Sequence, residues 1–286
     1  MTPTRQVAVA HGIPVLQPQK IREEAFLAAI RAFQPDLGVV AAFGRILPDT
    51  LLAIPRLGMI NVHASLLPKY RGAAPIQRAV LAGEQETGVS IMRVVTELDA
   101  GPTFAMARMA IGQDETSGEV EARLAVVGAE ALIPVVEDLA NGSAVETSQD
   151  ASQATFAPKV TKEESEIAWT DRADAIHNKV RGLQPWPLAS THLAGTRYVL
   201  RRTQCVTGGH AGSDVPAAAP GSDSGARVTH AAPGSILRVT RDDLVVACGH
   251  DTALRILEIQ PEGRRTLTTR EFLAGRRVTT TDRFGT

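Results

Sequence analysis

Hydrophobic residues in the first half of the chain alternate between helical spacing and short unbroken runs. Apolar side chains recur at helical intervals over residues 3–10 and 21–33, and the run from Leu37 to Phe43 contains no polar side chain. Such a run predicts a strand that is buried on both faces, and the alternation of helices and strands is typical of an α/β fold with a parallel sheet. Further helices are expected over residues 75–82, 117–139 and 171–182, and further strands over 13–16, 59–63, 89–94 and 104–111.

The pattern changes near residue 148, where small polar residues predict a linker. Short β segments separated by turn residues then predict a small barrel, and the Gly-, Ala-, Ser- and Pro-rich stretch from Gly208 to Pro233 predicts a disordered loop. The barrel strands are expected over residues 189–193, 198–202, 234–239, 243–247 and 253–260. We therefore expect an α/β domain over residues 1–147, a linker over 148–161, and a second domain over 162–286 with a low-complexity insertion at about 207–233.

Composition and charge narrow the class of protein. The formal net charge is −1, but the first half has an excess of acidic residues and the second half an excess of basic ones. The basic half indicates an anionic partner, although ordinary surface variation explains the asymmetry equally well. Cys205 and Cys248 fit no metal spacing and indicate reduced thiols. With no membrane-length apolar run and no signal-peptide pattern, we expect a cytoplasmic protein without a metal.

Candidate chemistry lies near the ends of two expected strands. Asn61 and His63 are two residues apart on a strand, so their side chains share one face. Asp99 follows the next strand, and polar groups at the carboxyl ends of parallel strands sit where ligands bind in α/β sheets. An amide can donate to a developing oxyanion, an imidazole can move a proton, and a carboxylate can orient that imidazole.

Each of these residues also has a structural interpretation, and the residues alone do not decide between the two. Asn61 can cap backbone groups, His63 can be a satisfied structural histidine, and Asp99 can be a turn residue before Gly101. The sequence contains no recognisable serine nucleophile, reactive cysteine or metal cluster. An attacking group would therefore come from a substrate.

The segments around these residues extend the pattern. Residues 58–68 read GMINVHASLLP, residues 69–77 read KYRGAAPIQ, residues 86–92 read ETGVSIM, and residues 98–101 read LDAG. This ordered set closely resembles the signature of the formyltransferases that use 10-formyltetrahydrofolate as formyl donor. The resemblance implies that Asn61, His63 and Asp99 form the catalytic trio. It also implies folate contacts from Ser65, Leu66, Leu67 and Pro68, and a pterin pocket lined by the backbone of Phe43, Gly44, Arg45, Ile46 and Leu47.

The same resemblance implies direct transfer of the formyl group to a free amine. The acceptors used in this family are methionyl-tRNA, glycinamide ribonucleotide, amino-sugar nucleotides and water. Residues 157–169, 185–187 and 232–237 and the C-terminal tail resemble the members that act on initiator methionyl-tRNA at the start of translation. Pro102 departs from those members, which usually carry an acidic residue there.

The C-terminal segment also suits an RNA partner physically. Residues 255–286 contain seven arginines and four acidic residues. A small barrel with such a surface fits an RNA backbone, although a solvated charged face has the same composition. We expect phosphate contacts from Arg264, Arg265, Arg276 and Arg277.

The resemblance further implies an N-terminally truncated, Rossmann-like parallel sheet followed by an OB-like barrel. Family members open with a strand, a glycine-containing turn, a helix and a second strand before the segment that resembles residues 3–7. The alternative hypotheses are therefore an inactive remnant, a misassigned start, or a related formyltransferase or hydrolase with another acceptor. We expect a monomer.

Overall fold

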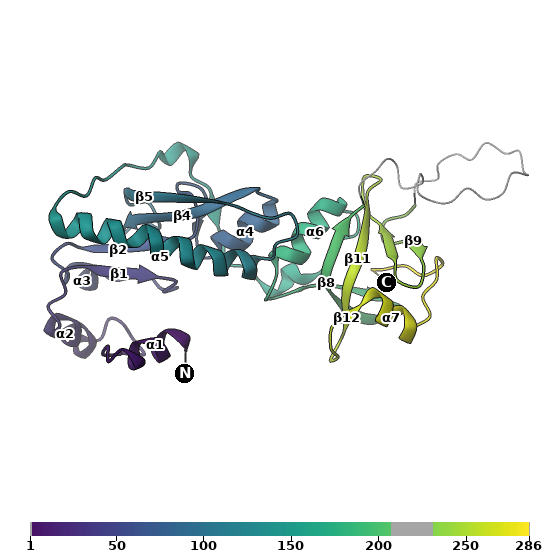
Figure 1. The fold of residues 1–286 in the computed structure, drawn as a ribbon, viewed down its shortest axis with the longest axis horizontal. Helices are drawn as coiled ribbons and strands as arrows, with labels where there is room; N and C mark the ends of the chain where they lie inside the picture. Colours follow the sequence, from purple (N-terminus) through teal and green to yellow (C-terminus); the bar gives the residue numbers. More distant parts are fainter. Residues whose placement is uncertain (1, 207–230, 286) are drawn as a thin grey trace, which may run out of the picture.

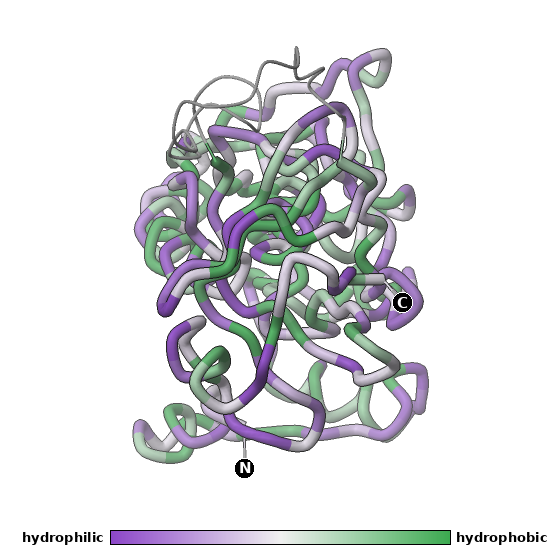
Figure 2. Tube along the Cα trace, turned by 90° about the vertical axis from the view of Figure 1, so that its right-hand side faces the viewer, coloured by the Kyte–Doolittle hydropathy of each residue, from purple (hydrophilic) through white to green (hydrophobic). Residues whose placement is uncertain are grey.

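Two main sheets organise the described residues of this computed structural model, 2–206 and 231–285. The first sheet has the strand order β1-β2-β4-β5, and the second has the order β7-β8-β11-β10-β9 with β12 paired to β11. Figure 1 shows the two sheets one after the other along the long axis of the molecule, with α6 between them. Hydrophobic and hydrophilic stretches alternate along the trace, as Figure 2 shows.

The first sheet confirms the α/β class but is mixed in direction. Its strands are β1 (Gly38–Ala41), β2 (Met59–His63), β4 (Glu86–Arg93) and β5 (Thr103–Ala110). β1 and β2 are parallel, as expected, whereas β4 is antiparallel to both β2 and β5. The nine residues between β4 and β5 are too few for a parallel crossover, which needs a dozen or more. The apolar run over residues 89–94 is compatible with either direction.

The burial predicted for β1 is wrong. β1 lies at an edge of the sheet, and the Val39 side chain is 47% exposed. The strand with continuous burial is β4, which is buried from Thr87 to Met92 because β2 and β5 flank it and α5 covers it. An unbroken apolar run therefore did not distinguish an edge strand from a central one.

The helices of the first half follow the expected hydrophobic periodicity. They are α1 (Pro3–Ala10), α2 (Glu24–Ala32), α3 (Asp49–Leu52), α4 (Pro75–Ala82) and α5 (Ser117–Asn141). α5 begins with a capping box between Thr116 and Glu119 and ends at Gly142, whose φ of 74° suits a left-handed cap. One core contains Ile60 of β2 with apolar residues of α4, α5 and β4.

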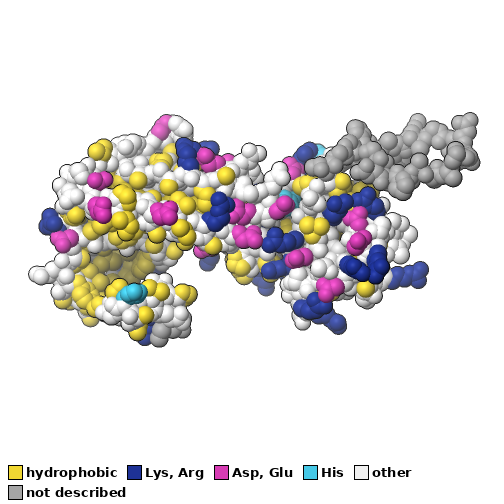
Figure 3. All heavy atoms as spheres, in the orientation of Figure 1, with side chains coloured by type: hydrophobic (Ala, Val, Ile, Leu, Met, Phe, Trp, Pro, Cys, Tyr) yellow, Lys and Arg dark blue, Asp and Glu magenta, His cyan; other side chains and the backbone are white. Residues whose placement is uncertain are grey.

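The strand predicted over residues 13–16 is wrong, since this segment is extended without pairing to any described strand. Its apolar side chains are largely exposed, with Ile13 at 56%. Exposed large apolar residues are frequent throughout the first 46 residues, and Figure 3 shows apolar side chains lining the hollow beside the N-terminal segment.

The second half is an antiparallel sheet with helices packed on it. Its elements are α6 (Ala173–Gly182), β7 (Ala189–Leu193), β8 (Thr196–Cys205), β9 (Ile236–Val239), β10 (Leu244–Ala247), β11 (Ala253–Pro261), β12 (Leu267–Thr268) and α7 (Thr269–Gly275). Phe284 bridges to Leu193 of β7, and Arg283 bridges to Ser235 beside β9. The tail thus joins both end strands, a closed arrangement like the predicted barrel. Residues 207–230 of the predicted loop lie outside the described residues.

Short elements not predicted from the sequence complete the fold. β3 (Arg71–Gly72) pairs in parallel with β6 (Phe156–Ala157) in the connector, which is the segment between α5 and α6. The connector also contains the 3-10 turns η1 (Ala151–Gln153) and η2 (Lys162–Ser165). β12 and α7 were missed too, although the capping box formed by Thr268 and Glu271 was a usable signal. Every helix in the described part of the chain is too short or too polar to span a bilayer.

Gly249 provides a test of the packing between the turn after β10 and the segment that precedes α6. Its N–H donates to the carbonyl oxygens of Trp169 and Asp171, and an added Cβ would lie 1.7 Å from the carbonyl oxygen of Thr170. We expect Gly249→Ala to lower the free energy of unfolding by about 1–3 kcal/mol, because the backbone must move to accommodate a methyl group. Urea denaturation measures this loss.

Gly275→Ala is the matched control, because no atom lies within 4 Å of an added Cβ there. Its free energy of unfolding should stay within about 0.5 kcal/mol of the parent value. Equal unfolding midpoints for the two variants would contradict the close packing at Gly249.

Candidate active site

Asn61 and His63 lie on the same face of β2, opposite the face that builds the core. Ile60 and Val62 point into the core with α4 and α5, so Asn61 and His63 point the other way. His63 is buried and Asn61 is half-buried. The strand is therefore anchored on one face and carries polar groups on the other, as expected from the sequence.

The His63 imidazole has an oxygen acceptor on each side. Its Nε2 lies 3.0 Å from the carbonyl oxygen of Tyr70, and because a carbonyl can only accept, Nε2 carries a proton and donates. Its Nδ1 lies 3.7 Å from Oδ2 of Asp99. A doubly protonated ring would thus have an acceptor facing each of its N–H groups, which makes the ring suited to holding and releasing a proton at Nδ1.

Asp99 reaches His63 by a route that differs from the expected one. Because β4 is antiparallel to β2, its last residue, Arg93, pairs with Ile60 at the end of β2 away from His63. Residues 94–102 then return to His63. There, Oδ2 of Asp99 accepts a 2.8 Å hydrogen bond from the Gly72 N–H. The sequence predicted the right neighbour for the wrong geometric reason.

The Asn61 amide is available to a ligand. Asn61 lies between Val40 of β1 and Met92 of β4 in the strand register. Among the described residues no hydrogen bond involves its side chain, so it does not act as a backbone cap. Its N–H group can donate to an oxygen placed on this face of the sheet.

The segment after His63 is fixed by one buried serine. The hydroxyl of Ser90 donates to the Ser65 carbonyl over 2.7 Å and accepts the Leu67 N–H over 3.1 Å. The hydroxyl of Ser65 in turn donates to the carbonyl of Lys69 over 2.6 Å. These bonds give the four predicted folate-contacting residues, from Ser65 to Pro68, a defined backbone shape.

The loop from Phe43 to Leu47 lies at the same end of the sheet as His63. β1 is parallel to β2 with Ala41 opposite Val62, so the residues after Ala41 run beside the end of β2. Phe43 and Ile46 are exposed, the latter at 77%, whereas Leu47 packs against the small core around Leu51. The two predicted folate-contacting segments therefore share one edge of the sheet.

The Tyr70 carbonyl oxygen binds His63, while the Tyr70 hydroxyl is a separate group with its own partner. Burial, followed by the hydrogen bond to Glu84, raises the pKa of the Tyr70 hydroxyl to about 12. The hydroxyl donates to the Glu84 carboxylate over 2.8 Å. The Tyr70 hydroxyl therefore remains protonated at neutral pH.

Two polar residues near Asp99 were not identified as site residues from the sequence. The Gln149 amide donates to the carbonyl oxygens of Asp99 and Gly101, and the buried Arg71 guanidinium donates to the Gln149 side-chain oxygen. No sequence signal marked Gln149, which lies in a small polar linker.

The part of the chain that the structure describes contains no group of three or more His, Cys, Asp or Glu residues able to hold a metal ion.

The four arginines predicted to contact RNA differ in their surroundings. Arg265 pairs with Glu271 over 2.8 Å, and Arg276 stacks on Tyr198 and donates to its hydroxyl oxygen. Arg264 and Arg277 are exposed and form no side-chain hydrogen bond or ion pair with the described residues.

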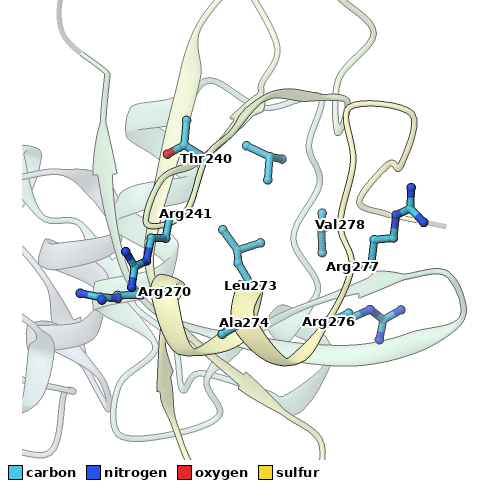
Figure 4. Close-up of a pocket in the computed structure, with 9 residues that line it drawn as sticks. Thr240, Arg241, Arg270, Leu273, Ala274, Arg276, Arg277 and Val278 are labelled. Carbon is cyan, nitrogen blue, oxygen red and sulfur yellow. The ribbon is translucent and has the colours of Figure 1, made fainter.

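A pocket of about 340 Å³ lies between α7 and the turn after β9. Figure 4 shows Arg241 and Arg270 on one side of it and Arg277 on the other, around a floor that includes Leu273 and Val278. Arg241 and Arg270 are exposed and, like Arg277, form no ion pair with a described residue. Figure 3 shows basic side chains gathered over this half of the molecule.

Comparison with known proteins bears on both halves of the chain. The formyl transferase family model matches residues 2–136, and the model of the formyl transferase C-terminal domain matches residues 159–277. The chain is 42% identical over 284 residues to the methionyl-tRNA formyltransferase of Methylococcus capsulatus, covering 98% of this chain and 85% of that protein. It is 41% identical over 274 residues to the methionyl-tRNA formyltransferase of Bacillus licheniformis, covering 96% and 80%.

Solved structures share the fold at lower sequence identity. WlaRD, a sugar 3N-formyl transferase, superposes with a TM-score of 0.63 at 13% identity, covering 91% of this chain and 82% of its own. HypX from Aquifex aeolicus, crystallised in complex with tetrahydrofolic acid, superposes with a TM-score of 0.60 at 18% identity, covering 86% and 40%.

Ser90 tests how the segment after His63 is held. Ser90→Ala removes one hydroxyl that serves both the Ser65 carbonyl and the Leu67 N–H, and Ser90 is fully buried. We expect the free energy of unfolding to fall by about 1–3 kcal/mol, because buried backbone groups lose their partner.

Ser148→Ala is the control, since Ser148 is exposed and its hydroxyl bonds to no described residue. Thermal unfolding of the two variants gives the comparison. A Ser90→Ala protein as stable as the Ser148→Ala protein would argue that Ser90 does not hold this segment.

Proposed function

The chain belongs to the formyl transferase family, and from this premise we propose that it transfers the formyl group of 10-formyltetrahydrofolate to the methionine amino group of initiator methionyl-tRNA. The relatives that share about 40% identity with nearly all of this chain carry the name methionyl-tRNA formyltransferase, which supports this acceptor. The structural neighbour with bound tetrahydrofolic acid supports a folate donor. The observation that supports this chemistry is the His63–Asp99 pair on the same face as the Asn61 amide, which has no hydrogen-bond partner among the described residues.

The reaction needs no nucleophile from the protein. The methionine amine attacks the formyl carbon, and the carbonyl oxygen becomes an oxyanion in the tetrahedral intermediate. The amine nitrogen then loses a proton, N10 of the folate gains one, and the bond between the formyl carbon and N10 breaks. The products are formylmethionyl-tRNA and tetrahydrofolate. The protein must therefore stabilise the oxyanion and move a proton between the two nitrogens.

We assign these tasks to three side chains. The Asn61 amide donates to the oxyanion, because it is half-buried and has no partner within the described chain. The protonated His63 ring adds positive charge, while its Nε2–H remains bound to the Tyr70 carbonyl. The proton at Nδ1 is thus the mobile one, and the Asp99 carboxylate 3.7 Å away stabilises the ring when it carries that proton.

The folate binds at the end of the sheet from which residues 43–47 and 65–68 extend. The first segment follows β1 and the second follows β2, so the donor's formyl group can reach Asn61 and His63 at the end of β2. The exposed Phe43 and Ile46 side chains and the open backbone of this loop suit a planar, partly apolar pterin.

The second half supplies the tRNA-binding surface. Arg241, Arg270 and Arg277 join Arg264 as exposed cations available to phosphates, since no acidic side chain in the described chain pairs with them. Arg276 and Arg265 lie beside these cations, where Arg276 stacks on Tyr198 and Arg265 pairs with Glu271.

We place the catalytic domain at residues 1–147 and the tRNA-binding domain at 162–286, joined by residues 148–161. The protein acts as a monomer in the cytoplasm, where translation takes place.

Substitution of the trio tests the reaction directly. We expect His63→Ala to lower kcat by about 10²–10⁴-fold through loss of proton transfer. Asn61→Ala should cost about 10²–10³-fold through loss of oxyanion stabilisation. Formylation of methionyl-tRNA with 10-formyltetrahydrofolate, followed on acid gels, measures both. His11→Ala, at an exposed histidine after α1, is the control and should retain parent turnover. Near-parent turnover of His63→Ala would show that its assigned role is wrong.

The salt dependence of tRNA binding tests the second half. The combined Arg241→Ala, Arg270→Ala and Arg277→Ala variant should bind tRNA more weakly. The slope of log affinity against log salt should shrink by about 0.7–0.9 for each lost phosphate contact. Arg172→Ala, at an exposed arginine paired with Asp174 over 3.0 Å, should leave the slope unchanged. Salt-independent binding by the parent protein would argue against a phosphate-binding surface.

A further inference from the structure

The side chain of Gln149 bridges two carbonyl groups on either side of Ala100. Its Nε2 lies 2.9 Å from the Asp99 carbonyl oxygen and 2.7 Å from the Gly101 carbonyl oxygen. An amide NH₂ group has two N–H bonds, and here each has an acceptor. One side chain from the connector thus ties down the backbone that carries the Asp99 carboxylate.

Arg71 determines which way the Gln149 amide faces. The Nε and Nη2 atoms of Arg71 lie 3.1 and 2.8 Å from the Gln149 oxygen, and the guanidinium is buried. A guanidinium only donates and the two backbone carbonyls only accept. In a flipped amide, the Gln149 NH₂ group would face the N–H groups of Arg71, and the Gln149 oxygen would face the carbonyl oxygens of Asp99 and Gly101. Only the observed orientation therefore gives every donor an acceptor.

The Asp99 backbone needs such support. Its φ of 48° lies in the left-handed region, which is sparsely populated for residues with a side chain and persists where the surroundings hold it. The Gly72 N–H holds the carboxylate at 2.8 Å, while Gln149 holds the backbone. Because Arg71 and Gly72 are adjacent in β3, one short strand binds both the Asp99 carboxylate and the Gln149 side chain.

We propose that Gln149 is a positioning residue for Asp99, held in place by Arg71, and that it sets the distance between the Asp99 carboxylate and His63. This inference rests on the proposed function for its catalytic consequence. The Nδ1–Oδ2 separation is 3.7 Å, so the ring and the carboxylate interact through space without a direct hydrogen bond. A shift of the loop at residues 94–102 therefore moves the Asp99 carboxylate relative to the His63 ring, because no hydrogen bond joins the two side chains.

Two substitutions at Gln149 separate its two contacts. Gln149→Leu removes both, and we expect kcat for formyl transfer to fall about tenfold to a hundredfold with little change in KM for the folate, since a displacement near 1 Å can cost this much. Gln149→Glu keeps an acceptor for Arg71 but places oxygen against two carbonyl oxygens. It should therefore keep the Arg71 contact and lose as much kcat as Gln149→Leu. Parent-like kcat in Gln149→Glu would overturn the proposal.

Gln153→Leu is the matched control on the same connector. Gln153 is exposed, and its amide donates only to the Asp150 carboxylate over 2.8 Å. Its kcat and unfolding midpoint should match the parent values. A loss of kcat in Gln153→Leu equal to that in Gln149→Leu would mean that the connector as a whole, and not the bridge, is responsible.

A double-mutant cycle shows whether Gln149 acts through Asp99. In the Asp99→Ala background, Gln149→Leu should cause no further loss of kcat, because the group it positions is gone. A further loss as large as in the parent background would assign Gln149 a separate structural role and overturn the proposal.

A readout without the acceptor distinguishes this inference from the proposed function. The ¹⁵N chemical shifts of the His63 ring report its charge and tautomer in the unliganded full-length protein. They should change in Gln149→Leu in the same direction as in Asp99→Asn, and remain unchanged in Gln153→Leu. If the parent protein fails to formylate methionyl-tRNA, the proposed function fails while this result still stands. Unchanged shifts in Gln149→Leu would refute the positioning role itself.

Discussion

The pairing between residues 70–74 and the connector is the interaction on which the candidate site depends. The Arg71 N–H donates to the Thr155 carbonyl over 2.8 Å, and the Ala74 N–H donates to the Ala157 carbonyl over 3.1 Å. Between them lies Gly72, where an added Cβ would lie 2.8 Å from the Ala157 carbonyl oxygen. This short ladder fixes the Tyr70 carbonyl that binds His63 and the Gly72 N–H that binds Asp99. The connector is therefore a structural part of the site.

The same connector leads into a polar interface between the two halves. The Ser117 hydroxyl at the start of α5 donates to the Gly182 carbonyl at the end of α6 over 2.7 Å. The buried Arg181 donates to the carbonyl of Glu115, and burial lowers the pKa of its guanidinium. Across the connector, Arg78 of α4 forms a salt bridge with Glu164 of η2 over 2.6 Å. Since buried polar groups must keep their partners, these bonds favour one arrangement of the two halves. The second half therefore keeps a fixed position relative to the candidate site.

Sequence reasoning succeeded where local chemistry decides the structure and failed where distant contacts do. β2 and α4 were predicted with correct bounds, because glycine and proline mark their ends. The proximity of Asp99 to His63 was predicted from a parallel sheet, whereas the chain achieves it by a return loop after an antiparallel strand. Gln149 was not predicted, because its partners lie 48–78 residues away and its own neighbourhood has the composition of a linker. Likewise, nothing in the local sequence distinguishes Arg276, which stacks on Tyr198, from Arg277, which remains free for a ligand.

The two faces of β2 have different roles, which explains how so short a strand holds polar side chains in fixed positions. On one face, Ile60 is fully buried and Val62 faces α5 so closely that a Cβ on Gly128 would lie 3.0 Å from it. The glycine lets the helix approach the sheet and fixes the strand from behind. On the other face, Asn61 and His63 are carried by a backbone that is already rigid, with β1 and β4 bonded on either side. A catalytic group needs restraint within a fraction of an ångström, and rigid elements provide it better than loops. Asp99 is the exception, since it is carried by a loop, and it is the residue that requires the added restraint from Gly72 and Gln149.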